Sequence, residues 1–348
     1  MKKIMIISDP ISFPLDGGTK VTVYQILKNN KKNKLYYLAT NDLNVGGIPL
    51  IIPKSEYRYS IINKIYAIYY IIKYSNEIDA YHFFLTPNKI STAIIYLIKL
   101  FTGKKIIITT SYKVKNKLNY FRIYDQCITY SKEMKDKLYK FNKNVITIYS
   151  GIDVVHFTIP KKRKTKPFTV VLCSEYRSVD CIKTALNIIK EIQKQKIPIK
   201  YIFALRKYKK TDMKIKLEMQ RQAEFIKIKE LIEWNDTVKD IRTILKRGHI
   251  IILPYQIIRK KKDLPIVILE AMSMGLIPLI NDIPPMNEIP LPKKLKINSI
   301  NPKDIAKRII EIYNLYSLDS QNKMRKIIII KFSLNTFIKK YNEVYNKL

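Results

Sequence analysis

Residues 263–280 have the sequence Asp263-Leu-Pro-Ile-Val-Ile-Leu-Glu270-Ala-Met-Ser-Met-Gly275-Leu-Ile-Pro278-Leu-Ile. Pro265 favours the first turn of a helix, because its missing N–H costs nothing there, and Asp263 precedes it as a candidate N-cap. Gly275 can adopt the left-handed conformation that ends a helix, and the apolar residues after it predict a buried strand. A helix that begins at the carboxyl edge of a parallel sheet offers an anion site at its N-terminus. The stretch therefore predicts an α/β protein with a binding site near Glu270.

The length and composition of the chain predict two globular domains. At about 150 residues per domain, 348 residues suffice for two, and a hydrophobic content of 47% excludes a disordered protein. Every apolar run is shorter than the roughly 18 residues that span a bilayer, and the apolar residues after Lys3 predict a first strand instead of a signal peptide. Three cysteines without metal-ligand spacing indicate a reducing compartment. We therefore expect a cytoplasmic protein.

The formal charge of +37 is spread over both halves of the chain. Such a charge attracts anionic lipid, nucleic acid or nucleotide-linked substrates. The alternative is a compositional bias, because the chain is rich in Lys, Ile, Tyr and Asn and poor in Gly, as A/T-biased coding would produce. The charge alone therefore suggests anionic partners and does not indicate which reaction, if any, the protein catalyses.

Apolar runs alternate with helical patterns before and after a basic, proline-bracketed stretch, which predicts an inter-domain linker at 159–168. Strands are expected before it at 3–8, 35–40, 50–52, 80–84, 105–109, 126–130 and 145–148, with helices at 18–28, 59–74, 92–101 and 132–140. After it, strands are expected at 169–173, 200–204, 225–228, 250–254 and 277–280, with helices at 179–195, 238–246 and 265–274. This alternation predicts two doubly wound parallel sheets, with ligands bound at the carboxyl edges of the strands.

Several motifs, in order along the chain, resemble those of glycosyltransferase family 4. The resembling segments are 14–20, 79–83, 124–131, 145–157, 254–275, 287–289, 332–333 and 341–345. The resemblance implies a GT-B fold, in which two Rossmann-like domains face each other across a cleft, here residues 1–158 and 169–330. It also implies that residues 331–348 form a helix that returns to the N-terminal domain.

The resemblance assigns roles to residues of the first domain and to one arginine of the second. Gly17 and Gly18 would let backbone N–H groups approach a diphosphate, although an ordinary glycine loop is the alternative. His82 would contact the donor sugar or the reaction centre, with a structural histidine as the alternative. Arg177 would neutralise the departing diphosphate in place of the family's lysine, since a guanidinium binds phosphate bidentately.

The 263–280 stretch carries the remaining site residues. Glu270 would accept hydrogen bonds from the ribose hydroxyls, because a carboxylate within an apolar helix is costly without partners. Lys262 stands where the family has the first glutamate of a Glu-x7-Glu pair, and Asp263, one residue later, is the candidate substitute. Residues near the helix N-terminus would contact the diphosphate: Leu264, Pro265, Ile266 and Val267.

These assignments predict a glycosyltransferase of the hexosyltransferase type that uses a nucleoside diphosphate sugar, with retention implied by the resemblance alone. No cofactor or metal is expected, because the sequence has no Asp-x-Asp pair and no His/Cys cluster. The acceptor would be a lipid-linked or protein glycan, with DNA less favoured. The segment 57–74 suits either an anionic membrane surface or a core-facing helix. The alternative function is a catalytically degenerate GT-B protein that binds a ligand, nucleic acid or membrane, which the substitution at Lys262 motivates.

Overall fold

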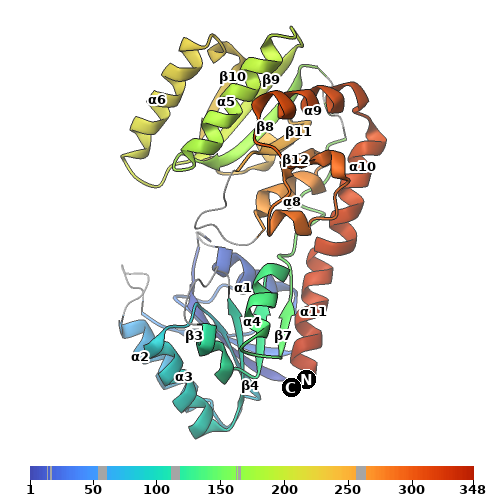
Figure 1. Ribbon diagram of the computed structural model, residues 1–348. Coiled ribbons are helices and arrows are strands. Elements are labelled where there is room, and N and C mark those ends of the chain that lie inside the picture. Colours follow the sequence, from blue (N-terminus) through green and yellow to red (C-terminus); the bar gives the residue numbers. More distant parts are fainter. Residues whose placement is uncertain are drawn as a thin grey trace. The chain divides into compact units, whose positions relative to one another are not determined.

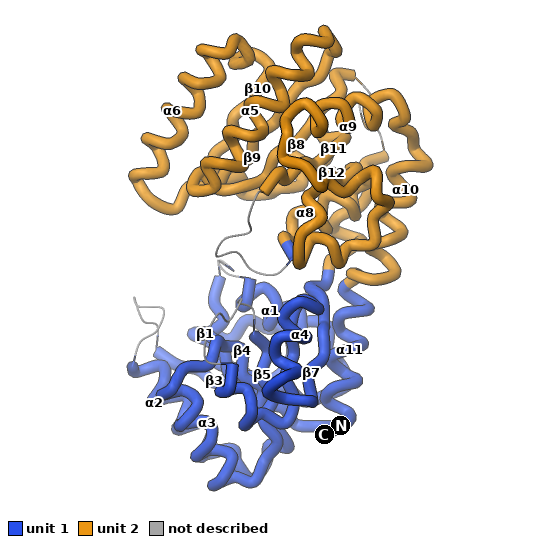
Figure 2. The backbone as a smooth tube through the Cα atoms, in the orientation of Figure 1, with its two compact units in different colours: residues 1–151, 260–264, 334–348 blue, residues 152–259, 265–333 orange. Residues whose placement is uncertain are grey.

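A computed structural model of the protein describes residues 1–13, 15, 18–53, 61–110, 118–161, 163, 166–255 and 264–348. These residues divide into two compact units (Figure 2). Unit 1 contains the described residues within 1–151 and 334–348 together with Leu264, and unit 2 contains those within 152–259 and 265–333. By this division, the described part of the predicted linker lies in unit 2.

Unit 1 is built on a parallel sheet with the strand order β3-β2-β1-β4-β5-β6-β7 among its described residues. The strands are β1 (Lys3–Ile11), β2 (Lys34–Ala39), β3 (Ile48–Ile51), β4 (Ala80–Phe84), β5 (Lys105–Thr110), β6 (Gln126–Thr129) and β7 (Val145–Thr147). The helices are α1 (Gly18–Asn29), α2 (Ile61–Lys73), α3 (Lys89–Thr102), η1 (Leu118–Ile123), α4 (Lys132–Tyr139) and α11 (Leu334–Asn346) (Figure 1). The chain reverses direction across the sheet between β1 and β4, which confirms the predicted doubly wound topology.

Both faces of this sheet are covered by helices, because alternate strand residues point to opposite sides. On one face, Ile4 and Ile6 of β1 belong to a core with Val23 of α1 and Tyr341 of α11. On the other face, the core contains Met5 of β1 with residues of α2, α3 and α4, namely Ile71, Ile95 and Met134. The last helix of the chain is therefore part of the core of unit 1.

Unit 2 contains a second parallel sheet, with the order β10-β9-β8-β11-β12-β13 among its described residues. The strands are β8 (Phe168–Glu175), β9 (Ile199–Arg206), β10 (Ile232–Asp236), β11 (Ile250–Leu253), β12 (Ile277–Asn281) and β13 (Lys296–Ile297). The helices are α5 (Val179–Gln193), α6 (Asp212–Phe225), η2 (Lys229–Leu231), α7 (Arg242–Leu245), α8 (Ile266–Ser273), η3 (Met286–Glu288), η4 (Lys293–Leu295), α9 (Pro302–Leu315), α10 (Leu318–Ile327) and the π-helix η5 (Ile328–Phe332). Here the winding reverses between β8 and β11.

One predicted strand of unit 2 is wrong. Residues 225–228 form the end of α6 and the turn after it, where Phe225 is exposed, and the strand is instead β10 at Ile232–Asp236. Because β10 is the edge strand, its exposed and half-buried positions hold Glu233, Asn235 and Asp236, so it lacks the apolar run of a central strand. The helix expected at 238–246 is also shorter, at Arg242–Leu245.

Candidate functional site

The reversal of strand order between β8 and β11 defines a switch point in unit 2. Ligands of open α/β sheets bind at such a point, outside the carboxyl ends of the strands. The chain leaves β8 at Glu175 and enters α5 at Val179, and α8 begins at Ile266 after β11 ends at Leu253. The segment 175–179 and the N-terminus of α8 are therefore the two described parts of the chain that the topology assigns to the switch point.

Helix α8 carries Glu270 at this place. The helix begins one residue later than expected, with Pro265 in extended backbone at the N-cap position, and Gly275 adopts the expected positive φ of 82° just after its end. Ile268, Leu269 and Ala271 are buried, whereas Glu270 is half-buried. Among the described residues, no hydrogen-bond donor or cation pairs with the Glu270 carboxyl at the distances of a hydrogen bond or ion pair. Helix α8 thus presents a carboxylate that no described residue pairs with.

The electrostatic surroundings of Glu270 make its ionised form costly. Burial, together with the nearby negative charge of Asp240, raises its pKa to about 7. Asp240 is held ionised by Arg242, whose Nη2 lies 2.7 Å from the carboxylate, so the pKa of Asp240 is lowered. Arg242 in turn lies 3.2 Å from Nδ1 of His156. A ligand that donates hydrogen bonds to Glu270 would relieve this cost.

Arg177 follows β8 and is held by Asp212 and Tyr208. Its Nε lies 3.7 Å from Asp212, and its guanidinium stacks 4.8 Å from the ring centroid of Tyr208. Asp212 is buried and accepts hydrogen bonds from the backbone N–H groups of Tyr208 and Lys209, at 2.8 and 3.2 Å, which lower its pKa. The Arg177 side chain remains 46% exposed, so it can bind an anion while Asp212 fixes its position.

The other predicted donor-site residues are distributed over both units. In unit 2, Pro265, Ile266 and Val267 are half-buried at the N-terminus of α8. Gly18 is the first residue of α1 in unit 1, and Leu264 is buried and also grouped with unit 1. Gly17, Lys262 and Asp263 lie outside the described residues. The structure therefore places Arg177 and Glu270 at the two sides of one switch point and leaves the predicted role of Asp263 a prediction.

His82 does not occupy a surface position in unit 1. The side chain is fully buried, its Nδ1 lies 2.7 Å from the Tyr345 hydroxyl, and its Nε2 lies 2.7 Å from Oγ1 of Thr109. Burial lowers its pKa to about 3, so the imidazole is neutral at physiological pH. Both ring nitrogens are engaged inside the core, which favours the structural alternative.

Sequence reasoning missed the groups that surround Arg177 and Glu270. Asp240 and Arg242 lie within a predicted helix, where a charged pair is ordinarily a solvated feature, and Asp212 begins a helix that the sequence did not reveal. Arg206 donates from Nη1 to the Tyr208 hydroxyl at 3.3 Å, so Tyr208 lies between two arginines. The available signal was the Arg206-Lys207-Tyr208 triplet at the end of an apolar strand.

Two negative observations apply to the described residues. They contain no group of three or more His, Cys, Asp or Glu side chains arranged to hold a metal ion. Among them there is also no helix of the length and hydropathy needed to cross a membrane.

Comparison with known proteins identifies the fold. A glycosyltransferase from Rickettsia africae superposes with a TM-score of 0.76 over 99% of this chain and 98% of its own, at 15% identity. HepE from Anabaena in complex with UDP gives 0.74 over the full length of both chains, at 12% identity. The lipopolysaccharide outer core galactosyltransferase WaaB gives 0.65 over the full length of both, at 13% identity. The two doubly wound sheets and these likenesses define a GT-B fold.

The sequence comparison is more local. Residues 167–314 match the model of the family described as glycosyl transferases group 1, and their described residues other than Leu264 lie in unit 2. A search of curated proteins found no match. The matched region includes Arg177, Asp240 and Glu270, so the candidate site lies within the part of the chain that resembles these transferases.

Proposed function

We propose that the protein transfers a sugar from a nucleoside diphosphate sugar to an acceptor hydroxyl. The observation that carries the proposal is the Glu270 carboxyl, which no described residue pairs with, at the switch point of unit 2 and inside the region that matches glycosyl transferases group 1. Structures similar to this chain include HepE in complexes with UDP, with UDP and glucose, and with UDP-glucose, so UDP is the nucleotide to test first.

Each described site residue has a role in this proposal. Ribose hydroxyls of the donor would donate hydrogen bonds to Glu270, and the diphosphate would bind Arg177 and the N-terminus of α8. During transfer, the bond between the anomeric carbon and the diphosphate oxygen breaks, and the acceptor oxygen bonds to that carbon. The diphosphate leaves with the electron pair, and the acceptor proton passes to it or to water. Arg177 and the helix dipole would stabilise the charge that develops on the leaving group.

The finer assignment rests on the sequence resemblance. We place the protein in glycosyltransferase family 4, with a hexosyl donor, retention of anomeric configuration and no metal requirement, because arginine and a helix N-terminus can neutralise the diphosphate. A cytoplasmic location and a lipid-linked or protein glycan as acceptor are part of the same proposal. The rival is a degenerate GT-B protein that binds without turnover, which Lys262 at a glutamate position favours.

The test is a thermal-shift screen of UDP, GDP, ADP and their common sugar conjugates, followed by donor hydrolysis with the nucleotide that binds. We expect one nucleotide to raise the melting temperature by several degrees and its sugar conjugate to be hydrolysed slowly, with or without EDTA. Binding without hydrolysis or transfer would support the degenerate binder. No shift with any nucleotide, in folded protein, would contradict the proposed donor site.

Replacement of Arg177 should weaken the diphosphate interaction selectively. We expect Arg177→Ala to raise the dissociation constant for UDP by about 10- to 100-fold, the range of a lost charge-assisted hydrogen bond. The matched control is Lys183→Ala, since the Lys183 side chain is 45% exposed on α5 and lies 3.7 Å from Glu218. Equal losses in the two variants, measured by calorimetry, would show that Arg177 acts through general charge alone.

A further inference from the structure

Helices α2 and α3 of unit 1 expose a large apolar surface. Of the 25 large hydrophobic side chains that are exposed among the described residues, 11 lie on these two helices, so the exposure is concentrated there. They are Ile61, Ile62, Ile65, Ile68, Tyr69 and Ile72 of α2, and Ile90, Tyr96, Leu97, Leu100 and Phe101 of α3. Both helices also contribute to the same core on one face of the sheet, through Ile71 and Ile95. We call this set of 11 side chains the apolar surface.

On α2, the apolar surface is a continuous stripe. Ile61, Ile65, Ile68 and Ile72 follow the i, i+4, i+7, i+11 spacing that places side chains on one side of a helix. Three tyrosines take the opposite side: Tyr66 and Tyr70 of α2 and Tyr74 just after it pack against the core. The Tyr70 hydroxyl donates to the carbonyl of Ile51 at 2.6 Å. The isoleucines therefore face away from the protein, where a water-exposed helix ordinarily carries polar residues.

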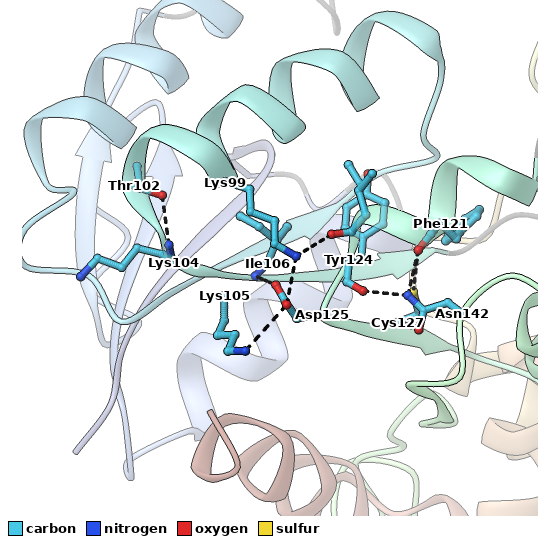
Figure 3. A network of polar contacts seen from close by, with 11 residues as sticks. Lys99, Thr102, Lys104, Lys105, Ile106, Phe121, Tyr124, Asp125, Cys127 and Asn142 are labelled. Carbon is cyan, nitrogen blue, oxygen red and sulfur yellow. Dashed lines mark hydrogen bonds and ion pairs between the residues drawn. The ribbon is translucent and has the colours of Figure 1, made fainter.

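On α3, one of the two lysines faces the protein while large apolar residues are exposed. Lys99 lies on the protein side of the helix, where its Nζ is 3.0 Å from Asp125 and 2.9 Å from the carbonyl of Ile123 (Figure 3). Asp125 also accepts from the backbone N–H of Ile106, which ties the helix to the sheet. Leu100 and Phe101, which follow Lys99, are 61% and 86% exposed. Lys99 thus serves the fold, whereas five large apolar side chains of the helix are exposed.

The charged residues within α2 and α3 are all lysines. Neither α2 nor α3 contains an Asp or Glu, and on α2 the exposed Lys64 and Lys73 flank the isoleucine stripe on its two sides. Lys89 begins α3, and Lys104 and Lys105 follow it, within a chain of formal charge +37. A second copy of the chain would bring like charges together at such a contact.

We infer that the apolar surface is a docking site for an anionic lipid bilayer, with α2 and α3 lying in the plane of the interface. Apolar side chains of this size enter the boundary between headgroups and acyl chains, and the flanking lysines reach anionic headgroups. This inference concerns unit 1 and does not require the proposed transferase activity. If both hold, membrane docking would bring the transferase close to acceptors that are anchored in the lipid.

Sedimentation with vesicles tests the inference directly. We expect the full chain to bind phosphatidylcholine vesicles that contain about one-third phosphatidylglycerol, and to bind pure phosphatidylcholine at least tenfold more weakly. Ile65→Glu and Leu97→Glu should each weaken binding to the anionic vesicles at least about tenfold. Each places a negative charge where the wild type would insert an apolar side chain into the bilayer. Lys64→Glu should weaken binding by a similar factor and increase the sensitivity to salt.

Matched controls separate this surface from general charge and hydrophobicity. Leu217→Glu on α6 replaces a leucine with 47% exposure, close to the 50% of Leu97, and Lys246→Glu reverses an exposed lysine outside α2 and α3. Both should bind vesicles as the wild type does. Melting temperatures with and without UDP should be unchanged in the α2 and α3 variants, so a failure of nucleotide binding is recognised separately.

Three outcomes would overturn the inference. Equal binding to neutral and anionic vesicles would remove the role of charge. Unaltered binding by Ile65→Glu and Leu97→Glu would assign the membrane contact to another surface. An absence of vesicle binding, with a dimer in light scattering that these two variants dissolve, would show that a second copy covers the apolar surface.

Discussion

Glu270→Ala should abolish the thermal stabilisation of the protein by UDP and lower turnover of the sugar donor by at least about 100-fold. The carboxyl is unpaired among the described residues and its pKa is raised to about 7, so the ligand hydroxyls are the groups that would stabilise its charge. Glu224→Ala is the control, because Glu224 is exposed on α6 and pairs with Lys229 at 3.1 Å. A Glu270→Ala protein that retains both properties would contradict the proposed donor site.

The raised pKa also fixes the sign of two pH dependences. The folded-state pKa of about 7 exceeds the ordinary value of 4.5, so the ligand-free protein loses stability as the pH rises from 4.5 through 7. Glu270→Gln should therefore stabilise the ligand-free protein more at pH 8 than at pH 5, by about 1–3 kcal/mol in chemical denaturation. Conversely, UDP-glucose should bind the wild type more tightly as the pH rises through 7, and Glu270→Gln should lose this dependence.

His82→Ala should destabilise the protein by about 3 kcal/mol or more, without a selective loss of UDP affinity in the folded fraction. The change opens a cavity in the core and leaves the hydroxyls of Tyr345 and Thr109 without their partner. Urea denaturation followed by circular dichroism measures the loss. His156→Ala is the control, because His156 is exposed and should change stability by less than about 0.5 kcal/mol.

A second variant separates the structural role of His82 from a catalytic one. Tyr345→Phe removes only the hydroxyl that faces Nδ1 and should cost about 1–2 kcal/mol, with turnover retained. If His82→Ala instead kept the wild-type stability and lost turnover, the histidine would act at the reaction centre, as the family resemblance implies. Stability reports on the packing of the core and turnover reports on the reaction, so the two measurements together distinguish a structural role of His82 from a catalytic one.

The sequence predicted the central elements of both sheets, because buried parallel strands are apolar runs. The runs at 80–84 and 250–254 correspond to β4 and β11, which lie inside their sheets. Prediction failed for β10, whose edge position leaves it with polar residues, and for α6, whose mixed sequence has no clear apolar stripe. Edge elements are set by tertiary context, which a single sequence does not display.

The candidate site was predicted as residue types but not as an arrangement. Glu270 was recognisable because a lone carboxylate in an apolar helix is energetically costly unless it binds a partner. The support of Arg177 by Asp212 and Tyr208 joins residues about thirty positions apart and could not be read from spacing. For His82, the family resemblance suggested a role in the chemistry, and only the structure reveals Thr109 and Tyr345 beside its ring.

Helix α11 has a consequence for the order in which the protein folds during synthesis. Its residues Phe337, Tyr341 and Tyr345 complete the core of unit 1, yet the ribosome makes them after the whole of unit 2. At 5–20 residues per second, the intervening segment takes roughly 10–40 s to translate. Throughout that interval, one apolar face of the nascent first unit lacks its cover, so unit 2 can finish folding before unit 1 does, and the nascent chain is then a natural client for a chaperone.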